Sequence, residues 1–514
     1  MPLEIFVPPH IGFDQQAIRV FLEEKGEIKS GEGFRLLKRS IDARSREIKV
    51  RLLIEPGELS TRKSGGSLPE LKVHQAPEVH IIGAGPAGLF AALACLQNGL
   101  KPVILERGKD VRTRRRDLVN ITRAGEVNPE SNYCFGEGGA GTYSDGKLYT
   151  RSGKRGDINE VLEILVAFGA DPDILVDAHP HIGTNKLPAL ITAMRDYIIR
   201  CGGEVHFDTR VSGWEKSADR LTALLLADGR RWPVKQLLLA TGHSARDIYY
   251  SLHQADILIE AKAIAMGVRI EHPQTIIDEL QYKRSDRGIY LPPASYSLVQ
   301  QADGRGVYSF CMCPGGVIAP CATADGEIVT NGWSPSKRNN PFANSGFVVE
   351  TRLEDVPSKF GDDAFRMLRW QQAIEQQAYV FGGGAQQAPA QRLVDFTKSK
   401  ISADLPACSY RPNITAVELK EVLPGFFHQR LQAALIMIGK KMPAYFTNEA
   451  VLVAPETRTS SPVRIPRDRE TFQHLQLNNL YPLGEGAGYA GGIVSAAMDG
   501  LAAVRKLKLW HNPQ

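Results

Sequence analysis

A chain of 514 residues is too long for one ordinary hydrophobic core, so we expect two or three domains. Hydrophobic residues make up 43% and charged residues 23%, and a formal net charge of +5 over this length does not by itself argue for nucleic acid binding. Seven loosely spaced cysteines exclude a disulfide framework and favour a reducing compartment. No clean apolar stretch reaches the roughly 18 residues of a membrane span, so we expect a cytoplasmic protein.

Residues 1–72 are predicted to form a small basic α+β module. The pattern indicates a strand at Leu3–Val7, a helix at Phe13–Glu24, and a hairpin with strands at Phe34–Ser40 and Ile48–Ile54. The hairpin carries seven basic side chains, namely Arg35, Lys38, Arg39, Arg44, Arg46, Lys49 and Arg51. Charge runs of this kind are usually solvated strand faces, and the alternative is a surface for RNA or an acidic protein.

A dinucleotide fingerprint follows the module. The short apolar strand Val79–Ile82 runs into the segment Gly83–Gly88, with the pattern Gly-x-Gly-x-x-Gly, which opens a helix rich in Ala and Leu. Gly83 permits the tight turn, Gly85 lets the backbone approach a pyrophosphate, and Gly88 lets the helix pack close to the strand. The phosphates are then expected at the helix N-terminus, where free N–H groups and the helix dipole favour negative charge.

The second strand of this fold is predicted at Pro102–Leu105 and ends in Glu106. This carboxylate lies 18 residues after Gly88, close to the spacing of about 20 for a residue that binds ribose hydroxyls. A carboxylate there repels a 2′-phosphate, so the adenosine half of NADP is disfavoured. The predicted contacts of the adenosine and pyrophosphate are Gly83, Gly85, Pro86, Ala87, Gly88, Glu106 and Arg107.

Three further segments favour FAD over NAD. The run Gly136–Thr142 has the glycine density of backbone beside a long cofactor, and Leu237–Gly242 is an apolar strand that ends in Ala-Thr-Gly. The third segment, Leu483–Gly492, opens the predicted helix Ile493–Lys506 about 400 residues after the first fingerprint. Taken singly, these segments are also typical of flexible loops or buried strands. Together they suit a cofactor with two distant ends.

The third segment also predicts how a flavin would be held. Glu485 is placed to reach ribityl hydroxyls, and the N–H groups of Gly492 and Ile493 are placed to face the flavin ring, where a helix N-terminus stabilises the negative charge of the reduced form. The further predicted FAD contacts are Gly138, Gly139, Thr142, Val211, Thr241, Gly242, Gly484, Glu485, Gly486, Gly491, Gly492 and Ile493.

Residues 261–450 differ from their surroundings because they mix strand-like runs with helical ones, such as Asp362–Tyr379 and Ala416–Ile438. We therefore predict an α/β fold with three parts. A Rossmann-like FAD-binding domain comprises residues 77–260 and 451–514, an α+β substrate or cap domain is inserted at 261–450, and the small α+β module precedes both.

Five runs of the sequence carry a wider resemblance, namely Gly83–Gly88, Phe135–Arg151, Phe310–Gly316, Glu456–Ile465 and Gly484–Gly500. Together they resemble a family of poorly characterised bacterial FAD-dependent dehydrogenases with relatives in plant plastids. The resemblance spans nearly the whole chain, the basic module included. It implies a glutathione-reductase-type FAD domain with a second domain placed over the flavin ring, and it implies no substrate.

Candidate catalytic residues are few, because the flavin carries the hydride chemistry and protein groups position and tune it. His243 follows Thr241-Gly242 directly, and His181 stands before a predicted helix. Either imidazole can exchange a proton near neutral pH, although each is also typical of a structural hydrogen-bonding residue. Lys147, Arg151, Arg458 and Arg464 are candidates for binding an anionic group.

The cysteines offer a different chemistry. Cys311 and Cys313 are two apart on a predicted strand and so point to one face. We consider a reactive thiol near the flavin, with Cys313 as the catalytic candidate, a soft-metal site, and inert buried cysteines. The Cys-x-x-Cys pairs of zinc sites are absent, so no metal site is predicted. Cys134 has no partner within five residues, which disfavours a redox disulfide there.

These observations predict an FAD-dependent oxidoreductase, a dehydrogenase or reductase, acting on an organic small molecule held between the FAD and cap domains. No second fingerprint in strand context is present, so NAD(P)H is expected to dock only transiently in the cleft. The alternative is a nucleic-acid-associated flavoprotein, RNA-binding or tRNA-modifying, that uses the basic N-terminal module.

Overall fold

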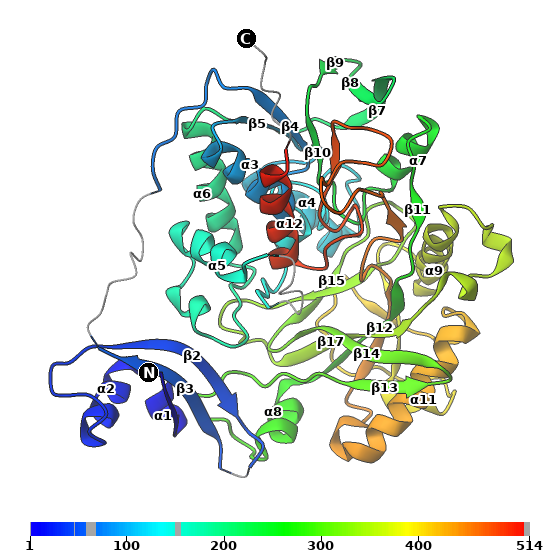
Figure 1. The fold of residues 1–514 in the computed structure, drawn as a ribbon. Helices are drawn as coiled ribbons and strands as arrows, with labels where there is room; N and C mark the ends of the chain where they lie inside the picture. Colours follow the sequence, from blue (N-terminus) through cyan, green and yellow to red (C-terminus); the bar gives the residue numbers. More distant parts are fainter. Residues whose placement is uncertain (1, 46, 58–67, 150–155, 508–514) are drawn as a thin grey trace.

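The computed structural model describes residues 2–45, 47–57, 68–149 and 156–507. It confirms the predicted α/β class, because a parallel Rossmann-like sheet is combined with antiparallel sheets. The parallel sheet lies in the upper part of Figure 1 and has the strand order β22-β10-β4-β5-β6. Its strands are β4 (Glu78–Ile82), β5 (Lys101–Leu105), β6 (Glu204–His206), β10 (Leu237–Leu239) and β22 (Leu480–Pro482).

Two helices from opposite ends of the chain pack side by side against this sheet (Figure 1): α3 (Pro86–Gln97) and α12 (Ile493–Arg505). A Cβ at Gly500 would lie 2.2 Å from the carbonyl oxygen of Ala87, so only glycine allows this approach. Helix α3 is buried along nearly its whole length, which explains why it is rich in Ala and Leu and has no polar face.

The remaining elements of this domain surround the sheet. They are α4 (Val111–Ala124), α5 (Ile158–Ala167), α6 (Leu187–Arg200), α7 (Arg246–Gln254) and the antiparallel strands β7 (Val211–Ser217), β8 (Arg220–Leu226) and β9 (Arg231–Pro233). Helix α4 begins where the Asp110 side chain accepts hydrogen bonds from two backbone N–H groups, and it ends at Gly125, whose φ is +71°.

The inserted cap is built on a mainly antiparallel sheet of seven strands, in the order β13-β14-β17-β12-β20-β18-β19. The strands are β12 (Ala265–Pro273), β13 (Val299–Ala302), β14 (Arg305–Cys313), β17 (Phe342–Glu350), β18 (Ala388–Arg392), β19 (Ile414–Ala416) and β20 (Val451–Glu456). The other cap elements are α8 (Gln274–Tyr282), α9 (Arg366–Gly382), α10 (Leu393–Thr397), α11 (Gly425–Lys441) and the hairpin of β15 (Val317–Pro320) and β16 (Thr330–Trp333).

Two expectations for the cap differ from the structure. Strand β20 pairs with β12 and β18, so the cap sheet extends to Glu456 and our division at residue 450 falls before its last strand. The helix expected from Ala416 begins only at Gly425, because Ala416 belongs to β19 and the residue before Pro424 disfavours helical geometry. The chain crosses between the domains through paired strands, β11 (Glu260–Ala261) and β21 (Val463–Arg464).

The N-terminal module lies at the lower left of Figure 1 and has a sheet of order β1-β3-β2. Its elements are β1 (Leu3–Val7), α1 (Pro9–Gly12), α2 (Gln15–Glu24), β2 (Phe34–Asp42) and β3 (Lys49–Pro56). Most of the basic hairpin residues face acids: Arg35, Arg39, Arg44, Lys49 and Arg51 all form ion pairs. These pairs reduce the positive charge that the hairpin offers to RNA, and Arg46 lies outside the described residues.

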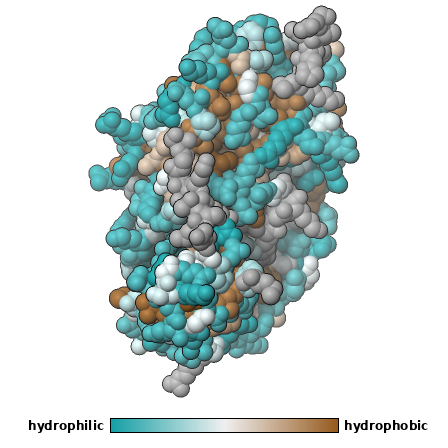
Figure 2. All heavy atoms as spheres, turned by 60° about the vertical axis from the view of Figure 1, so that its left-hand side comes forward, coloured by the Kyte–Doolittle hydropathy of each residue, from teal (hydrophilic) through white to brown (hydrophobic). Residues whose placement is uncertain are grey.

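One of these pairs docks the module. Arg39 is buried, and its guanidinium donates to the carboxylates of Asp173 and Asp177 at 2.6 and 2.7 Å. On the face shown in Figure 2, hydrophilic side chains predominate and hydrophobic ones are interspersed among them. Among the described helices, none combines the length and apolar character that crossing a membrane requires.

Candidate functional site

The carboxyl ends of β4, β5, β10 and β22 meet at a cleft with a cavity volume of about 350 Å³. This is the edge of a parallel sheet at which ligands bind in open α/β folds. The sequence-predicted residues that line it are Gly83, Gly85, Pro86, Ala87, Glu106, Arg107, Gly139, Val211, Thr241, Gly242, His243, Gly484, Glu485, Gly491, Gly492 and Ile493. Phe310, Cys311 and Asn331 are cap residues that also line it.

The first turn has the geometry expected of the fingerprint. Gly83 has a φ of +101°, and a Cβ there would lie 2.4 Å from the carbonyl oxygen of Ala240. A Cβ at Gly88 would lie 2.0 Å from the carbonyl oxygen of Gly83, so Gly88 serves helix packing and does not line the cleft. Gly85 caps α3, whose first residue is Pro86, and the helix N-terminus points into the cleft.

Glu106 is buried and holds three chain segments together. Its carboxylate accepts hydrogen bonds from the backbone N–H groups of Ala84 at 2.8 Å, Gly108 at 2.9 Å and Gly136 at 3.0 Å. A carboxylate has about four lone-pair sites, so one remains for a ligand hydroxyl. The residue therefore fixes the glycine turns around the cleft in addition to lining it.

Next to Glu106, Arg107 belongs to an ion-pair cluster at one end of the cleft. Its guanidinium donates to Asp247 at 2.8 Å and to Glu130 at 3.0 Å, and it lies 4.2 Å from the ring centroid of Phe135. Arg210 approaches Glu130 at 3.3 Å. The cluster anchors this end of the cleft through shared carboxylates.

The glycine-rich loop is held from behind by Arg114, which sequence analysis did not single out. This arginine of α4 is fully buried and donates to the carbonyl oxygens of Asn132, Glu137 and Gly139 at 2.8, 2.8 and 2.9 Å. Contact between loop and fingerprint is close, since a Cβ at Gly139 would lie 3.2 Å from Cα of Gly85. Arg114 bonds to residues 18 to 25 positions further along the chain, so no local sequence pattern predicts its role.

Two predicted contacts in this loop do not reach the cleft. The hydroxyl of Thr142 is buried and donates to the carbonyl oxygen of Glu137 at 2.6 Å. The N–H of Gly138 donates to the carbonyl oxygen of Ala84 at 2.8 Å. Both residues stabilise the loop, and neither contributes to the cleft lining.

The fourth wall comes from the C-terminal glycine cluster. A Cβ at Gly486 would lie 2.6 Å from the carbonyl oxygen of Gly242, so this glycine supports the β10 turn and does not line the cleft. The N–H of Gly492 donates to the carboxylate of Glu485, so in this arrangement it is engaged and does not face a flavin. The N–H of Gly491 donates to the hydroxyl of Ser495 at 3.0 Å.

The three catalytic candidates have different environments. His243 lines the cleft, with Nδ1 2.9 Å from the hydroxyl of Ser244 and Nε2 3.6 Å from the Glu485 carboxylate, and burial lowers its pKa. His181 does not line the cleft. Its Nε2 lies 3.1 Å from the carbonyl oxygen of Ser336, and burial lowers its pKa to about 4. Cys313 is buried behind the cleft, and its neighbour Cys311 is the cysteine that lines it.

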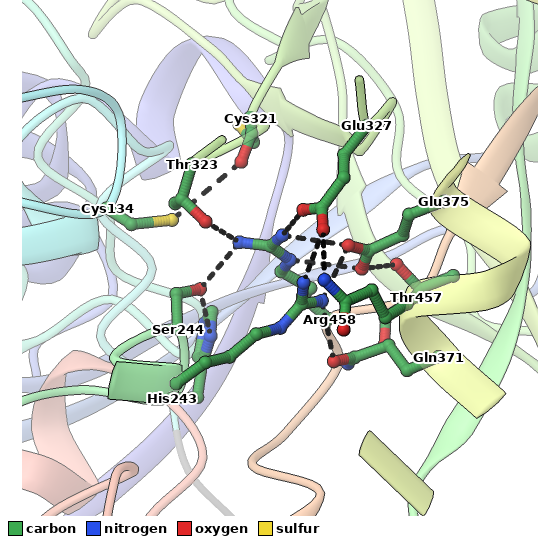
Figure 3. A network of polar contacts seen from close by, with 12 residues as sticks. Cys134, His243, Ser244, Cys321, Thr323, Glu327, Gln371, Glu375, Thr457 and Arg458 are labelled. Carbon is green, nitrogen blue, oxygen red and sulfur yellow. Dashed lines mark hydrogen bonds and ion pairs between the residues drawn. The ribbon is translucent and has the colours of Figure 1, made fainter. Parts of the chain in front are cut away.

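Figure 3 shows a buried network at the junction of the two domains, centred on Arg458. The five N–H groups of this guanidinium are all engaged, with Glu375 twice and with Ser244, Thr323 and Glu327 once each, at 2.8 to 3.1 Å. Arg458 lines the cleft with donors already satisfied, which makes it a structural clamp and not the anion-binding residue we considered. Arg464 belongs to β21, and Arg151 lies outside the described residues.

Glu375 is the acidic centre of this clamp. It also accepts a hydrogen bond from Arg246 of α7 at 2.6 Å, so helix α9 of the cap is tied to the FAD domain. Burial opposes its ionised form, but Arg246 and Arg458 outweigh burial and lower the pKa of Glu375 to about 2. The same burial raises the pKa of Glu327. No sequence motif predicted this network, because its members are spread over more than 200 residues.

Lys147 lines the cleft, and only the folded structure shows which groups it contacts. Its Nζ lies 3.5 Å from Oδ2 of Asp145, which is buried and also receives a hydrogen bond from Arg338 at 2.9 Å. Burial works against the charged amine, but Asp145 and Cys311 outweigh it and raise the pKa of Lys147. The cleft therefore contains an amine whose charged form is favoured by its neighbours.

Comparison with known proteins identifies families and solved structures to which this chain is similar. A family described as FAD-dependent protein, C-terminal domain-like matches residues 263–459, and a domain of unknown function (DUF8436) matches residues 2–55. Among solved structures, CtdE in complex with FAD is 10% identical with a TM-score of 0.31, over 83% of this chain and 82% of that chain. The halogenase PltM is 12% identical with a TM-score of 0.37, over 83% of this chain and 67% of that chain.

These structural similarities are too distant to transfer an activity. A nearer relative is an uncharacterized protein of Clostridium beijerinckii, which is 38% identical over 493 residues, 91% of this chain and 90% of that protein. The chain therefore belongs to the same family as the Clostridium beijerinckii protein, and its cap is similar to the C-terminal domain of FAD-dependent proteins.

Proposed function

We propose that the protein binds FAD in the cleft and uses it in an oxidoreductase reaction on an organic substrate held between the FAD domain and the cap. One observation carries the proposal: glycine turns that lie about 400 residues apart in the sequence, around Gly85 and Gly484, line the same cleft at the end of one parallel sheet. The description of the family that matches the cap supports the cofactor.

The lining fits a dinucleotide in two respects. A Cβ at Gly85 would meet nothing nearer than Cα of Gly139, at 3.9 Å, so folding does not demand glycine there, whereas a close-lying pyrophosphate does. Two cleft-lining oxygens, Oγ1 of Thr241 and Oδ1 of Asp145, are buried without a hydrogen-bond partner in the described structure. Buried polar atoms of this kind call for a partner, which a ligand can supply.

Each part of FAD has residues suited to hold it. The N-terminus of α3 would hold the pyrophosphate, Glu106 the adenosine ribose, and Glu485 the ribityl chain. Bound FAD supplies the hydride chemistry. The cap residues Phe310 and Cys311 would then border the space in which a substrate meets the flavin.

The electron donor we propose is NAD(P)H that docks transiently in the cleft. His243 is the residue suited to hold or move a proton there, because its imidazole lines the cleft and lies 3.6 Å from a carboxylate. Anaerobic mixing with NADH and NADPH tests this directly. Bleaching of the flavin absorbance by one of them identifies the donor, and absence of bleaching with both contradicts a nicotinamide donor.

The test of FAD binding is the substitution Gly85→Ala. Backbone angles at Gly85 are φ −76° and ψ −176°, which alanine adopts freely, so the variant should fold. The added methyl group projects toward the pyrophosphate position, and we expect FAD retention to fall by at least about tenfold. Flavin absorbance per purified protein measures the retention.

The matched control is Gly425→Ala in the cap, where a Cβ meets nothing within 4 Å. This variant should keep its FAD, and, compared without FAD, both variants should have the Tm of the parent protein. Equal FAD content in parent and Gly85→Ala protein, or a colourless parent that does not take up added FAD, contradicts the proposal.

A further inference from the structure

The cap strand β14 ends beside the cleft in two cysteines that the proposed reaction does not use. Cys311 is half-buried and lines the cleft, while Cys313 is fully buried. The pairing of β14 with β17 shifts register between Phe310 and Cys313, and Cys311 has a φ of +46°. A bulge of this kind re-aims side chains, and a non-glycine residue adopts such a φ only where its surroundings impose it.

Both sulfur atoms face one amine. Nζ of Lys147 lies 3.5 Å from Sγ of Cys311 and 3.4 Å from Sγ of Cys313. The two thiols are therefore on the same side of the strand and close to each other. Residues two apart in an extended strand have Cα atoms about 6.8 Å apart, at the upper end of the roughly 4.4–6.8 Å of disulfides, and the bend at a bulge brings them nearer.

The charges around the pair favour one thiolate and one thiol. Hydrogen bonding from Cys313 lowers the pKa of Cys311 well below its ordinary value against the effect of burial, and Lys147 and Arg269 lower it further. The pKa of Cys313 is correspondingly raised by its hydrogen bond with Cys311 and by burial. A thiolate beside a thiol is the arrangement from which disulfides form and to which they are reduced.

We propose that Cys311 and Cys313 form a dithiol–disulfide couple that exchanges electrons with the flavin in the cleft. The inference rests on the proposed function, which supplies the oxidised flavin as electron acceptor. As the S–S bond forms, the thiolate and the thiol together give up two electrons and the one proton of the thiol. Both electrons and that proton pass to the flavin, which becomes the anionic reduced form. The reverse transfer breaks the S–S bond and restores the thiolate and the thiol.

The same side chains argue against a metal site. An ammonium group within 3.5 Å of both sulfur atoms repels a cation, and within the described ranges no group of three or more His, Cys, Asp or Glu side chains is arranged to hold one. Cys134 also lines the cleft, but its Sγ faces the carbonyl oxygen of Cys321 at 3.9 Å. Cys134 therefore serves as the control: it is a thiol in the cleft that has no second cysteine two residues away.

An anaerobic reductive titration of the oxidised, FAD-loaded protein tests the couple. A flavin alone takes about two electrons, and a flavin in equilibrium with a disulfide takes about four. We expect about four in the parent protein and in Cys134→Ser, and about two in Cys311→Ser and in Cys313→Ala. A parent protein that takes only the flavin's two electrons overturns the inference while leaving FAD binding intact.

A second measurement does not depend on the flavin. The parent protein and the FAD-poor Gly85→Ala variant are treated with the thiol oxidant diamide, blocked with iodoacetamide and mapped by peptide mass. We expect the peptide that contains both Cys311 and Cys313 to be two hydrogens lighter and unalkylated, and dithiothreitol to reverse this. A fully alkylated pair, or a disulfide mapped to Cys134 and Cys321, contradicts the proposal. A colourless parent protein that still forms the Cys311–Cys313 disulfide contradicts the proposed function, and with it the flavin as electron acceptor, but it leaves the disulfide itself supported.

Discussion

Among single side chains, Lys147 is the amine that faces both cysteines of the cap strand β14. It lies between the carboxylate of Asp145 and the two sulfur atoms of Cys311 and Cys313. An amine in this position stabilises a thiolate, which is the reactive form of cysteine. The charged groups that face Cys311 are Lys147 and Arg269, which favour the thiolate, and Asp145, which opposes it.

Substituting Lys147→Met keeps the length of the side chain and removes its charge. Without the ammonium the pKa of Cys311 should rise toward its ordinary value, and alkylation of Cys311 by iodoacetamide near neutral pH should slow by about tenfold. Peptide-resolved alkylation rates measured across pH check this, since the rate profile should shift to higher pH. Lys147→Arg should retain the parent profile, and an unchanged profile in Lys147→Met would show that Lys147 does not control the thiol.

Sequence reasoning found the glycines of the cleft more readily than its charged residues. Gly83, Gly85 and Gly484 stand in turns whose need for glycine can be read from a few neighbouring residues. Arg114 was missed, and Lys147 and Arg458 were named only as candidates for binding an anionic group, because each acts on atoms that only the folded chain brings near. Thr142 shows the opposite case. It lies in a glycine-rich motif and was predicted to contact FAD, but its hydroxyl donates to the carbonyl oxygen of Glu137 in its own loop.

Among the helices and strands, α9 of the cap and α7 of the FAD domain are joined by the clamp around Arg458 and Glu375 (Figure 3). The clamp is a network of buried charges, and breaking a buried pair by removing one partner leaves an uncompensated charge. It therefore couples the stability of the cap to that of the FAD domain.

The variant Glu375→Gln tests this coupling. It leaves Arg246 and Arg458 to share the one remaining carboxylate of Glu327, and we expect a destabilisation of about 3–5 kcal/mol. Thermal and urea unfolding measure the loss. The control is Glu354→Gln, which removes an exposed partner of Arg352 and should cost at most about 1 kcal/mol. Equal unfolding midpoints for the two variants would show that the clamp contributes nothing.

The predicted helices and strands match the structure where hydrophobic periodicity and the positions of glycines indicate the same boundaries. The helices and strands of the dinucleotide fold lie within a few residues of the predicted ranges, as in α12 (Ile493–Arg505). The cap was harder, because β20 (Val451–Glu456) is an apolar run that returns to a sheet begun at Ala265. Strand partners so far apart in the sequence are set by packing, which no local window contains.

For the protein as a whole, one buried acid makes stability depend on pH. Glu271 of β12 is almost fully buried, and burial raises its pKa to about 7, although its carboxylate accepts a hydrogen bond from the N–H of Ser409 at 2.7 Å. The folded protein thus binds this proton more tightly than the unfolded chain, whose value is 4.5. The associated stability is complete below pH 4.5 and is lost as the pH rises through about 7.

Substituting Glu271→Gln should remove this dependence, because the amide does not ionise. We expect the variant to gain on the order of 1–3 kcal/mol over the parent protein at pH 8 and little or nothing at pH 4. Urea unfolding at both pH values measures the difference. The exposed Glu449→Gln serves as control. A variant that is less stable than the parent at pH 8 would mean that the hydrogen bonds to the carboxylate outweigh its burial.

The paired crossing strands β11 and β21, together with the Arg458 clamp, have a consequence for ligand exchange. The chain leaves the Rossmann-like domain and returns to it through two short segments that are hydrogen-bonded to each other. Arg458, just before the returning strand, donates five hydrogen bonds. If the cap swung away from the Rossmann-like domain, both connecting segments would bend, and the buried guanidinium of Arg458 would lose its ion-pair partners. We therefore expect the cap to keep its position relative to the Rossmann-like domain when a ligand enters or leaves the cleft.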